Sequence, residues 1–160
     1  MVQVEAEIAG DRGDARLGRQ LLELVRVRVP GVVDLARLEL EFHAHGVLRL
    51  PLYAARLKGA AIAPSVNLTT EKETIATALL DGHDGIGQVI SYRAMQLAIR
   101  KAREAGVSYV AVRNSNHFGA AAYYPMMALA HDMIGIALTN ASPRLAPTGG
   151  VERLFGNNPW

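Results

Sequence analysis

The stretch from Val107 to Gly119 (VSYVAVRNSNHFG) decides how the chain is read. Val107 to Val112 is apolar and rich in valine, which predicts a buried strand, and Ala120 to Asp132 has the composition of a helix. Polar residues between a strand and a helix lie where α/β proteins present side chains to ligands. His117 is the side chain in this motif that titrates near neutral pH. From spacing alone the motif is either a ligand site or a capped turn, because its asparagine and serine residues suit both.

Further strands and helices are predicted on both sides of this motif. Upstream, Glu73 to Leu80 reads as a strand, and Val89 to Ala105 reads as a helix with one apolar face and Gly106 as its C-terminal cap. Downstream, Met133 to Thr139 reads as a buried strand. The predicted β-α-β-α-β order indicates an α/β domain over residues 69–160.

The N-terminal part of the chain differs in composition from the rest. Residues 1–42 are rich in Arg and Glu, and their apolar residues recur at helical spacing in two stretches, 15–29 and 32–42. A shorter helix is predicted from Tyr53 to Lys58, where Gly59 follows. We therefore expect a small helical domain over residues 1–68 before the α/β domain.

Composition narrows the classes of function. The formal net charge is +2, which is too small to indicate nucleic-acid binding, and there is no cysteine for a disulfide or a thiolate site. No apolar signal core precedes the acids of the N-terminus, and no run of about 18 apolar residues predicts a membrane span. The expectation is a cytoplasmic protein that binds neither nucleic acid nor membrane.

Two glycine and histidine patterns are weak signals. Gly82 to Gly87 follows a predicted strand, but its order is G-x-x-G-x-G, and no acidic residue ends the next strand as the dinucleotide fingerprint requires. A glycine turn that lets a helix pack close to a strand is the simpler interpretation. His43 and His45 alone make a poor metal site, so no metal is predicted.

His45, Arg49 and Tyr53 form a more informative set. Their i, i+4, i+8 spacing places them on one face if the segment is helical. An Arg guanidinium binds a carboxylate through two hydrogen bonds, and an imidazole exchanges a proton with a neighbouring hydroxyl or carbonyl oxygen. The alternative is an ordinary solvated helix face.

Four stretches in this order resemble a known family: His45 to Tyr53 (HGVLRLPLY), Asp81 to Val89 (DGHDGIGQV), Asn114 to Ala121 (NSNHFGAA) and Ala146 to Pro159 (APTGGVERLFGNNP). They are similar to the malate/L-lactate dehydrogenase family of the second type. That family is distinct from the Rossmann-type lactate dehydrogenases, and it includes ureidoglycolate, sulfolactate and diketogulonate oxidoreductases.

The resemblance implies a fold and an activity. The implied fold is a small N-terminal helical domain followed by part of a non-Rossmann, mixed-sheet α/β cofactor domain. The implied activity is hydride transfer between NAD or NADP and a small 2-hydroxy or 2-oxo acid such as malate or L-lactate, by a homodimer. Family chains are about twice as long, so the resemblance covers only their N-terminal half.

The resemblance also implies roles for single residues. The positions of His45 and His117 line the reaction centre, and both residues are candidates for the proton exchange, with no choice made between them. Substrate binding is implied for Arg49, Tyr53, Thr148 and Gly149. Cofactor binding is implied for Asn116, Asn140, Ser142, Pro147 and Asn158.

Two departures from the family pattern leave alternatives open. Ala44 replaces the usual serine before His45, which removes a hydroxyl, and residues 1–42 match the family poorly. The chain is therefore either an NAD(P)-dependent oxidoreductase, a truncated and inactive family member, or a non-catalytic domain that binds carboxylates.

Overall fold

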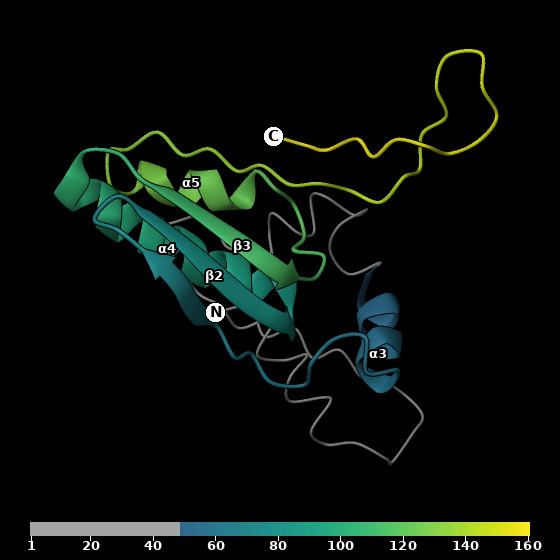
Figure 1. Ribbon diagram of the computed structural model, residues 1–160, viewed down its shortest axis with the longest axis horizontal. Helices are drawn as coiled ribbons and strands as arrows, with labels where there is room; N and C mark the ends of the chain where they lie inside the picture. Colours follow the sequence, from purple (N-terminus) through teal and green to yellow (C-terminus); the bar gives the residue numbers. More distant parts are fainter. Residues whose placement is uncertain (1–48) are drawn as a thin grey trace, which may run out of the picture.

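The computed structural model describes residues 49–160. Its elements are, in order, α3 (Leu50–Lys58), β1 (Thr69–Glu73), β2 (Thr77–Gly85), α4 (Gly87–Ala105), β3 (Tyr109–Ser115) and α5 (Tyr123–Leu129) (Figure 1). β2 is the central strand, antiparallel to β1 and parallel to β3. The expectation of an α/β fold with a mixed sheet is confirmed.

Helix α4 is the largest element that covers the sheet. It begins two residues earlier than predicted and ends at Gly106, which has the left-handed φ of 82° expected of a C-terminal cap. Ile90 and Ala94 lie on its buried face, and Figure 1 shows the helix lying along one face of the sheet. Ala94 packs with Ala78 and Leu80 of β2, so local periodicity and tertiary packing agree here.

The predicted strand from Glu73 to Leu80 is wrong in its bounds. Glu73 is the last residue of β1, and a short turn separates it from β2. Part of the predicted glycine turn, Gly82 to Gly87, belongs to β2, which runs to Gly85. His83 and Asp84 adopt left-handed φ values of 46° and 56°, and the pairing with β3 resumes at Gly85. A bulge of this kind keeps a glycine- and aspartate-rich stretch within a sheet.

The buried Lys101 fastens the β1–β2 turn to α4. Its Nζ donates to the Thr74 carbonyl at 2.6 Å and lies 2.7 Å from a carboxylate oxygen of Glu73. Both contacts compensate the loss of hydration at the ammonium group.

Helix α5 is shorter than the predicted Ala120 to Asp132. It starts at Tyr123, and Pro125 lies in its first turn, where its missing N–H costs no intrahelical bond. Tyr123 and Tyr124 are buried in a cluster with Ile99 of α4, which places α5 beside α4.

The predicted strand from Met133 to Thr139 is wrong for the described chain. The segment is extended but belongs to no strand, and it runs along the same side of the molecule as α5 (Figure 1). Beyond it, residues 139–160 fold back on themselves, with Thr139 N–H donating to Pro159 and Leu145 bridging to Phe155. A β-strand is defined by hydrogen bonds to a neighbouring strand, and this segment has no partner strand among residues 49–160.

Helix α3 lies at one end of the sheet. It ends at Gly59 as predicted, and Tyr53 is buried with Ile62 and Ile86. The predicted domain boundary at residue 68 stays a prediction, because the earlier helical stretches lie outside the described residues. No helix within residues 49–160 is long and apolar enough to cross a membrane.

Candidate functional site

The loop that carries His117 follows β3 and is fastened on three sides. The Asn116 side-chain amide donates to the carbonyls of Asp84 at 2.8 Å and Gly85 at 3.3 Å, at the end of β2. At the start of α4, Gly87 is so close that a Cβ there would lie 2.1 Å from the Asn116 carbonyl oxygen. On the third side, the Phe118 ring stacks on Tyr124 of α5. The sheet and both neighbouring helices therefore position the loop.

Tyr53 and His117 meet although 64 residues separate them. The Tyr53 hydroxyl lies 2.7 Å from His117 Nδ1, and the two ring centroids are 5.9 Å apart. The backbone N–H of Gly119 also donates to Nδ1, at 3.2 Å. Because a backbone N–H can only donate, Nδ1 must be the unprotonated nitrogen, and Tyr53 must donate to it as well. This geometry assigns the neutral ring its proton on Nε2.

This arrangement suits a group that exchanges protons. With the neutral ring, the Tyr53 hydroxyl donates to Nδ1. With the charged ring, Nδ1–H donates and the same hydroxyl oxygen accepts. The hydroxyl can therefore serve both protonation states of His117, whereas the Gly119 N–H serves only the neutral ring.

Arg49 immediately precedes α3, in helical backbone conformation (φ −89°, ψ −13°). Its i, i+4 relation to Tyr53 places both residues on the same side of the helix start, as the spacing predicts. His45, the third member of the predicted set, lies outside the described residues. The structure thus brings Tyr53 to His117 and Arg49 to the same helix end.

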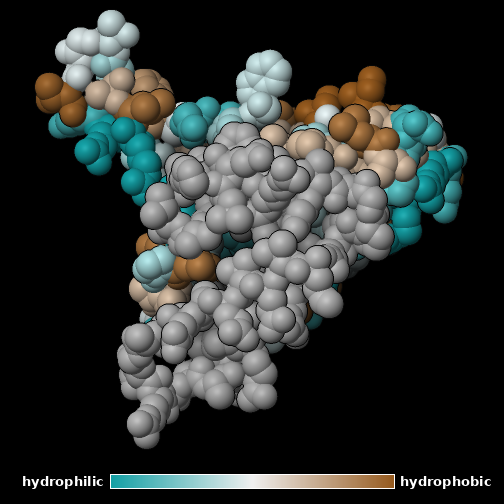
Figure 2. All heavy atoms as spheres, turned by 180° about the vertical axis from the view of Figure 1, so that it is seen from behind, coloured by the Kyte–Doolittle hydropathy of each residue, from teal (hydrophilic) through white to brown (hydrophobic). Residues whose placement is uncertain are grey.

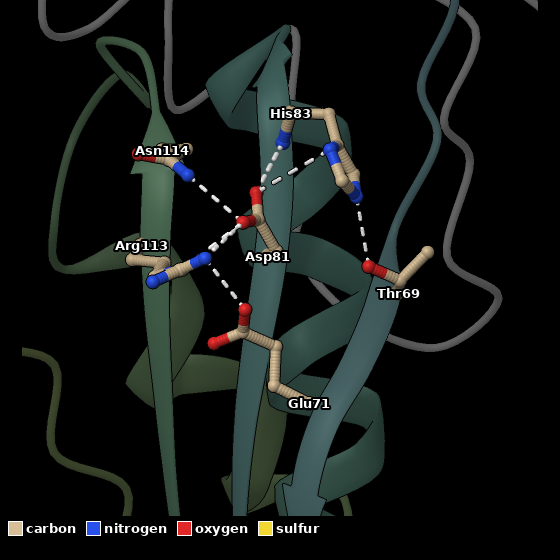
Figure 3. A network of polar contacts seen from close by, with 6 residues as sticks. All are labelled: Thr69, Glu71, Asp81, His83, Arg113 and Asn114. Carbon is tan, nitrogen blue, oxygen red and sulfur yellow. Dashed lines mark hydrogen bonds and ion pairs between the residues drawn. The ribbon is translucent and has the colours of Figure 1, made fainter.

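Asp81 is a buried carboxylate that the sequence analysis did not single out. It lies in β2 and accepts hydrogen bonds from the backbone N–H of His83 (2.8 Å), from Arg113 Nε (3.0 Å) and from the Asn114 side-chain amide (2.8 Å) (Figure 3). Asn114, with a left-handed φ of 49°, opens the loop that leads to His117. The available signal was an acidic residue at the end of the apolar run Ala78 to Leu80.

These contacts determine the charge state of Asp81. The His83 N–H lowers the pKa of the Asp81 carboxyl most, burial opposes it, and Arg113, Asn114 and the charge on His83 lower it further. The network reaches β1, because Arg113 pairs with Glu71 at 2.6 Å and the His83 imidazole contacts the Thr69 hydroxyl at 2.8 Å (Figure 3). Asp81 therefore links β2 directly to β3, and Arg113 and His83 extend the network to β1, at the end of the sheet that leads to the His117 loop.

The residues predicted to contact the cofactor divide into two groups. The side-chain amides of Asn116 and Asn158 hydrogen-bond to backbone groups. Asn116 donates to the Asp84 carbonyl, and Asn158 Oδ1 accepts from the Ala141 N–H at 2.8 Å. Asn140 and Ser142 are exposed, and their side chains make no hydrogen bond within residues 49–160. Whether any of them contacts a cofactor stays a prediction.

The predicted substrate turn lies in the folded-back tail. The Gly150 N–H donates to the Pro147 carbonyl at 2.8 Å and closes a turn around Thr148 and Gly149. Figure 1 shows this part of the tail projecting beyond the sheet. The backbone hydrogen bonds of residues 140–160 in the described chain join the tail to itself and to Thr139, so its place in a binding site also stays a prediction.

The start of α4 does not offer a free helix terminus to a phosphate. The carbonyl oxygens of Asn116 and His117 lie against Gly87, so protein backbone covers this end. The geometry agrees with the interpretation of Gly82 to Gly87 as a close-packing turn rather than a dinucleotide fingerprint.

Comparisons with known proteins agree with this geometry. Residues 37–160 match the family model described as malate/L-lactate dehydrogenase. The chain is 49% identical to the L-sulfolactate dehydrogenase of Methanocaldococcus jannaschii over 118 residues, which are 74% of this chain and 34% of that relative. It is 51% identical to the malate dehydrogenase of Pyrococcus abyssi over 116 residues, 72% of this chain and 32% of the relative. The chain spans about a third of the length of these relatives.

A more distant relative and a solved structure extend the comparison. The NAD(+) ureidoglycolate dehydrogenase of Escherichia coli K12 is 31% identical over 117 residues, 73% of this chain and 34% of that protein. The structure of the M. jannaschii sulfolactate dehydrogenase superposes with a TM-score of 0.72 at 48% identity, covering 78% of this chain and 36% of that one. The resemblance carried by the four sequence motifs is confirmed, and the chain belongs to the malate/L-lactate dehydrogenase family.

Proposed function

We propose that this chain supplies the acid–base part of an NAD(P)-dependent oxidoreductase that acts on a small 2-hydroxy or 2-oxo acid. The observation that carries the proposal is the contact of the Tyr53 hydroxyl and the Gly119 N–H with His117 Nδ1. It fixes the orientation of an imidazole in a loop fastened to the sheet and both helices.

The chemistry requires a proton at the substrate oxygen. Reduction of a 2-oxo acid adds a hydride to the carbonyl carbon and a proton to the carbonyl oxygen, and oxidation reverses both transfers. We assign the proton exchange to His117 Nε2, with Tyr53 holding Nδ1 in both charge states. His45 is the second proton-exchange candidate and lies outside the described residues.

Substrate recognition is assigned to the Arg49 guanidinium, whose planar fork matches a carboxylate. The names of the relatives support this class of substrate. Sulfolactate, malate and ureidoglycolate each carry a hydroxyl on the carbon next to a carboxylate. Thr148 and Gly149 would contribute to the same site from the tail.

A nicotinamide cofactor would supply or accept the hydride when bound. One observation fits such a group: the Gln88 side-chain oxygen, in the first turn of α4, is buried and has no hydrogen-bond partner among the described residues. A buried acceptor without a partner costs about 1–3 kcal/mol, and a carboxamide N–H would satisfy it. Gln88 would hold the nicotinamide end, with Asn140 and Ser142 as further contacts and Asn116, Pro147 and Asn158 beside them.

The remaining parts of the proposal concern assembly and location. We include a helical domain over residues 1–68, a homodimer and a cytoplasmic location. The choice between NAD and NADP is left to experiment, although the name of the E. coli relative specifies NAD(+).

The test is the oxidation of NADH or NADPH with pyruvate, oxaloacetate or sulfopyruvate, followed by absorbance. His117→Ala should lower turnover by about 10²–10⁴-fold, as expected for the loss of a general acid–base group. His131→Ala is the matched control, because His131 is exposed and its side chain hydrogen-bonds only to Arg103 within residues 49–160. Arg49→Lys should mainly raise KM, since an ammonium cannot replace the bidentate fork.

Two results would overturn the proposal. The first is a chain that neither reduces any of these 2-oxo acids nor quenches NADH fluorescence. The second is equal turnover in His117→Ala and His131→Ala. Carboxylate binding that survives His117→Ala without turnover in the parent would instead favour a non-catalytic carboxylate-binding domain, an alternative suggested by the partial coverage of the relatives.

A further inference from the structure

The end of β2 beside the His117 loop is built from polar groups. Figure 2 shows hydrophobic side chains gathered along the upper edge of the molecule. The end of β2 has the opposite character, because it carries Asp81, a carboxylate whose side chain is only 6% exposed. A charge is tolerated so far from water only where hydrogen-bond donors replace its hydration. The donors around Asp81 therefore show what the carboxylate holds in place.

The two oxygens of Asp81 hold two different segments of backbone. Oδ1 accepts from the backbone N–H of His83 at 2.8 Å, inside the bulge of β2. Oδ2 accepts from Arg113 Nε at 3.0 Å and from the Asn114 side-chain amide at 2.8 Å, near the end of β3 (Figure 3). One carboxylate thus fixes the end of β2 and the end of β3 relative to each other.

Both of these segments have unusual backbone conformations. His83 and Asp84 have φ values of 46° and 56°, and Asn114 has a φ of 49°. Residues other than glycine adopt this left-handed region seldom, and they keep it where surrounding contacts hold them there. Asp81 supplies such a contact on each side, to the His83 N–H and to the Asn114 amide.

The His117 loop depends on both segments. The bulge of β2 presents the carbonyls of Asp84 and Gly85, and the Asn116 side chain donates to both of them, at 2.8 and 3.3 Å. Asn114 determines the direction in which the chain leaves β3, three residues before His117. A change in either segment would therefore move the imidazole.

We infer that Asp81 is a positioning residue for His117: through the bulge of β2 and through Asn114, it holds the loop so that His117 Nδ1 meets the Tyr53 hydroxyl. Asp81 makes no hydrogen bond to Tyr53 or His117 within residues 49–160, so it acts through the backbone between them. The inference rests on the proposed role of His117 in proton exchange.

The role requires a carboxylate and not merely a polar side chain. Both oxygens of Asp81 face donors, the His83 N–H on one side and Arg113 with Asn114 on the other. An amide has one accepting oxygen and one donating NH₂ group. In Asp81→Asn, whichever way the amide lies, a donor faces a donor and one of the two segments loses its partner.

The experiment compares the His117 ring in two variants by NMR. Asp81→Asn and Asn114→Gly should both shift the His117 ring resonances and weaken the nuclear Overhauser effect between the Tyr53 and His117 rings. Asn114→Gly is the milder change, because glycine adopts a φ of 49° freely and only the amide donor is lost. It keeps the test available if Asp81→Asn does not fold, which urea unfolding shows.

Glu73→Gln is the matched control. It also converts a carboxylate to an amide in the same sheet, but Glu73 pairs with Ala78, at the opposite end of the β1–β2 ladder from Asp81. The substitution weakens the contact with Lys101 and leaves the bulge of β2 unaltered. The His117 ring resonances should therefore stay as in the parent.

Turnover of a 2-oxo acid gives the second readout. Asp81→Asn should lower kcat by about 10- to 100-fold, as expected when a catalytic group is misplaced, and should leave KM unchanged because Arg49 is not disturbed. Asn114→Gly should lower kcat less. The double variant should be no slower than Asp81→Asn alone, because both changes interrupt one chain of contacts. Glu73→Gln should match the parent.

Three outcomes would overturn the inference. The first is a folded Asp81→Asn or Asn114→Gly chain whose His117 resonances match those of the parent. The second is an equal kcat in Asp81→Asn and Glu73→Gln, and the third is full additivity in the double variant. The resonances report on the ring even in a chain without turnover, so failure of this inference is distinguishable from failure of the proposed function.

Discussion

The loop that carries His117, between β3 and α5, and the segment from residue 133 to 139, after α5, differ in how their polar and apolar groups are satisfied. Around His117, side-chain and backbone contacts come from β2, α3, α4 and α5. Along residues 133–139, one side is packed and the other is exposed with its backbone unpaired. The difference indicates that several elements among residues 49–160 position the acid–base loop, whereas residues 133–139 are packed on one side only.

Removing a packed isoleucine beside the His117 loop should have the largest effect on stability. Ile90 is fully buried, and its Cδ1 fills the space above Gly82 and Gly85 at the end of β2. Ile90→Ala should lower the free energy of unfolding by about 2–5 kcal/mol, from lost burial and a residual cavity. Urea unfolding monitored by circular dichroism measures it, and a loss below about 1 kcal/mol would contradict the packing described here.

Asp81 should contribute a pH-dependent part of the stability. Its pKa is lowered from 3.8 in the folded chain, so the ionised carboxylate stabilises the fold above that pH, and the contribution is lost as pH falls through the lower, folded pKa. Asp81→Asn should therefore be less stable than the parent at pH 7, and the difference should narrow below pH 3.8. Parallel urea titrations at several pH values test this, and a difference that stays constant or widens in acid would refute it.

The smallest effect is expected at the exposed side chains of the extended segment 133–139. Ile136→Ala should change the unfolding free energy of the chain alone by less than about 0.5 kcal/mol, because the side chain is mostly exposed. The same urea experiment measures it beside Ile90→Ala. A loss as large as that of Ile90→Ala would mean that residues 133–139 are covered within this chain, and the comparison would fail.

Sequence reasoning succeeded where structure is local. The apolar positions Ile90 and Ala94, with Gly106 as a cap, predicted α4 almost to its ends. It missed β1, because Thr69–Glu73 (TTEKE) is polar and exposed on every residue and shows no alternation. It predicted a paired strand at Met133–Thr139 from apolar composition, but strand pairing depends on a partner that composition does not reveal.

The candidate site was predicted in part. The i, i+4 spacing predicted that Arg49 and Tyr53 lie on the same side of a helix, and both residues do lie at the start of α3. The contact between Tyr53 and His117 could not be derived from spacing, since it depends on how α3 docks through Ile62 and Ile86. Asp81 was missed because its role depends on Arg113, a contact made only across paired strands.

The central claim is that Tyr53 and Gly119 hold His117 with its ring proton on Nε2. Long-range ¹H–¹⁵N correlation spectra of the histidine-labelled chain, assigned with His117→Ala, report the tautomer directly. The structure predicts a neutral ring protonated at Nε2 at high pH, with an altered Nδ1 resonance in Tyr53→Phe. A ring protonated at Nδ1, or an Nδ1 resonance that Tyr53→Phe leaves unchanged, would contradict the account.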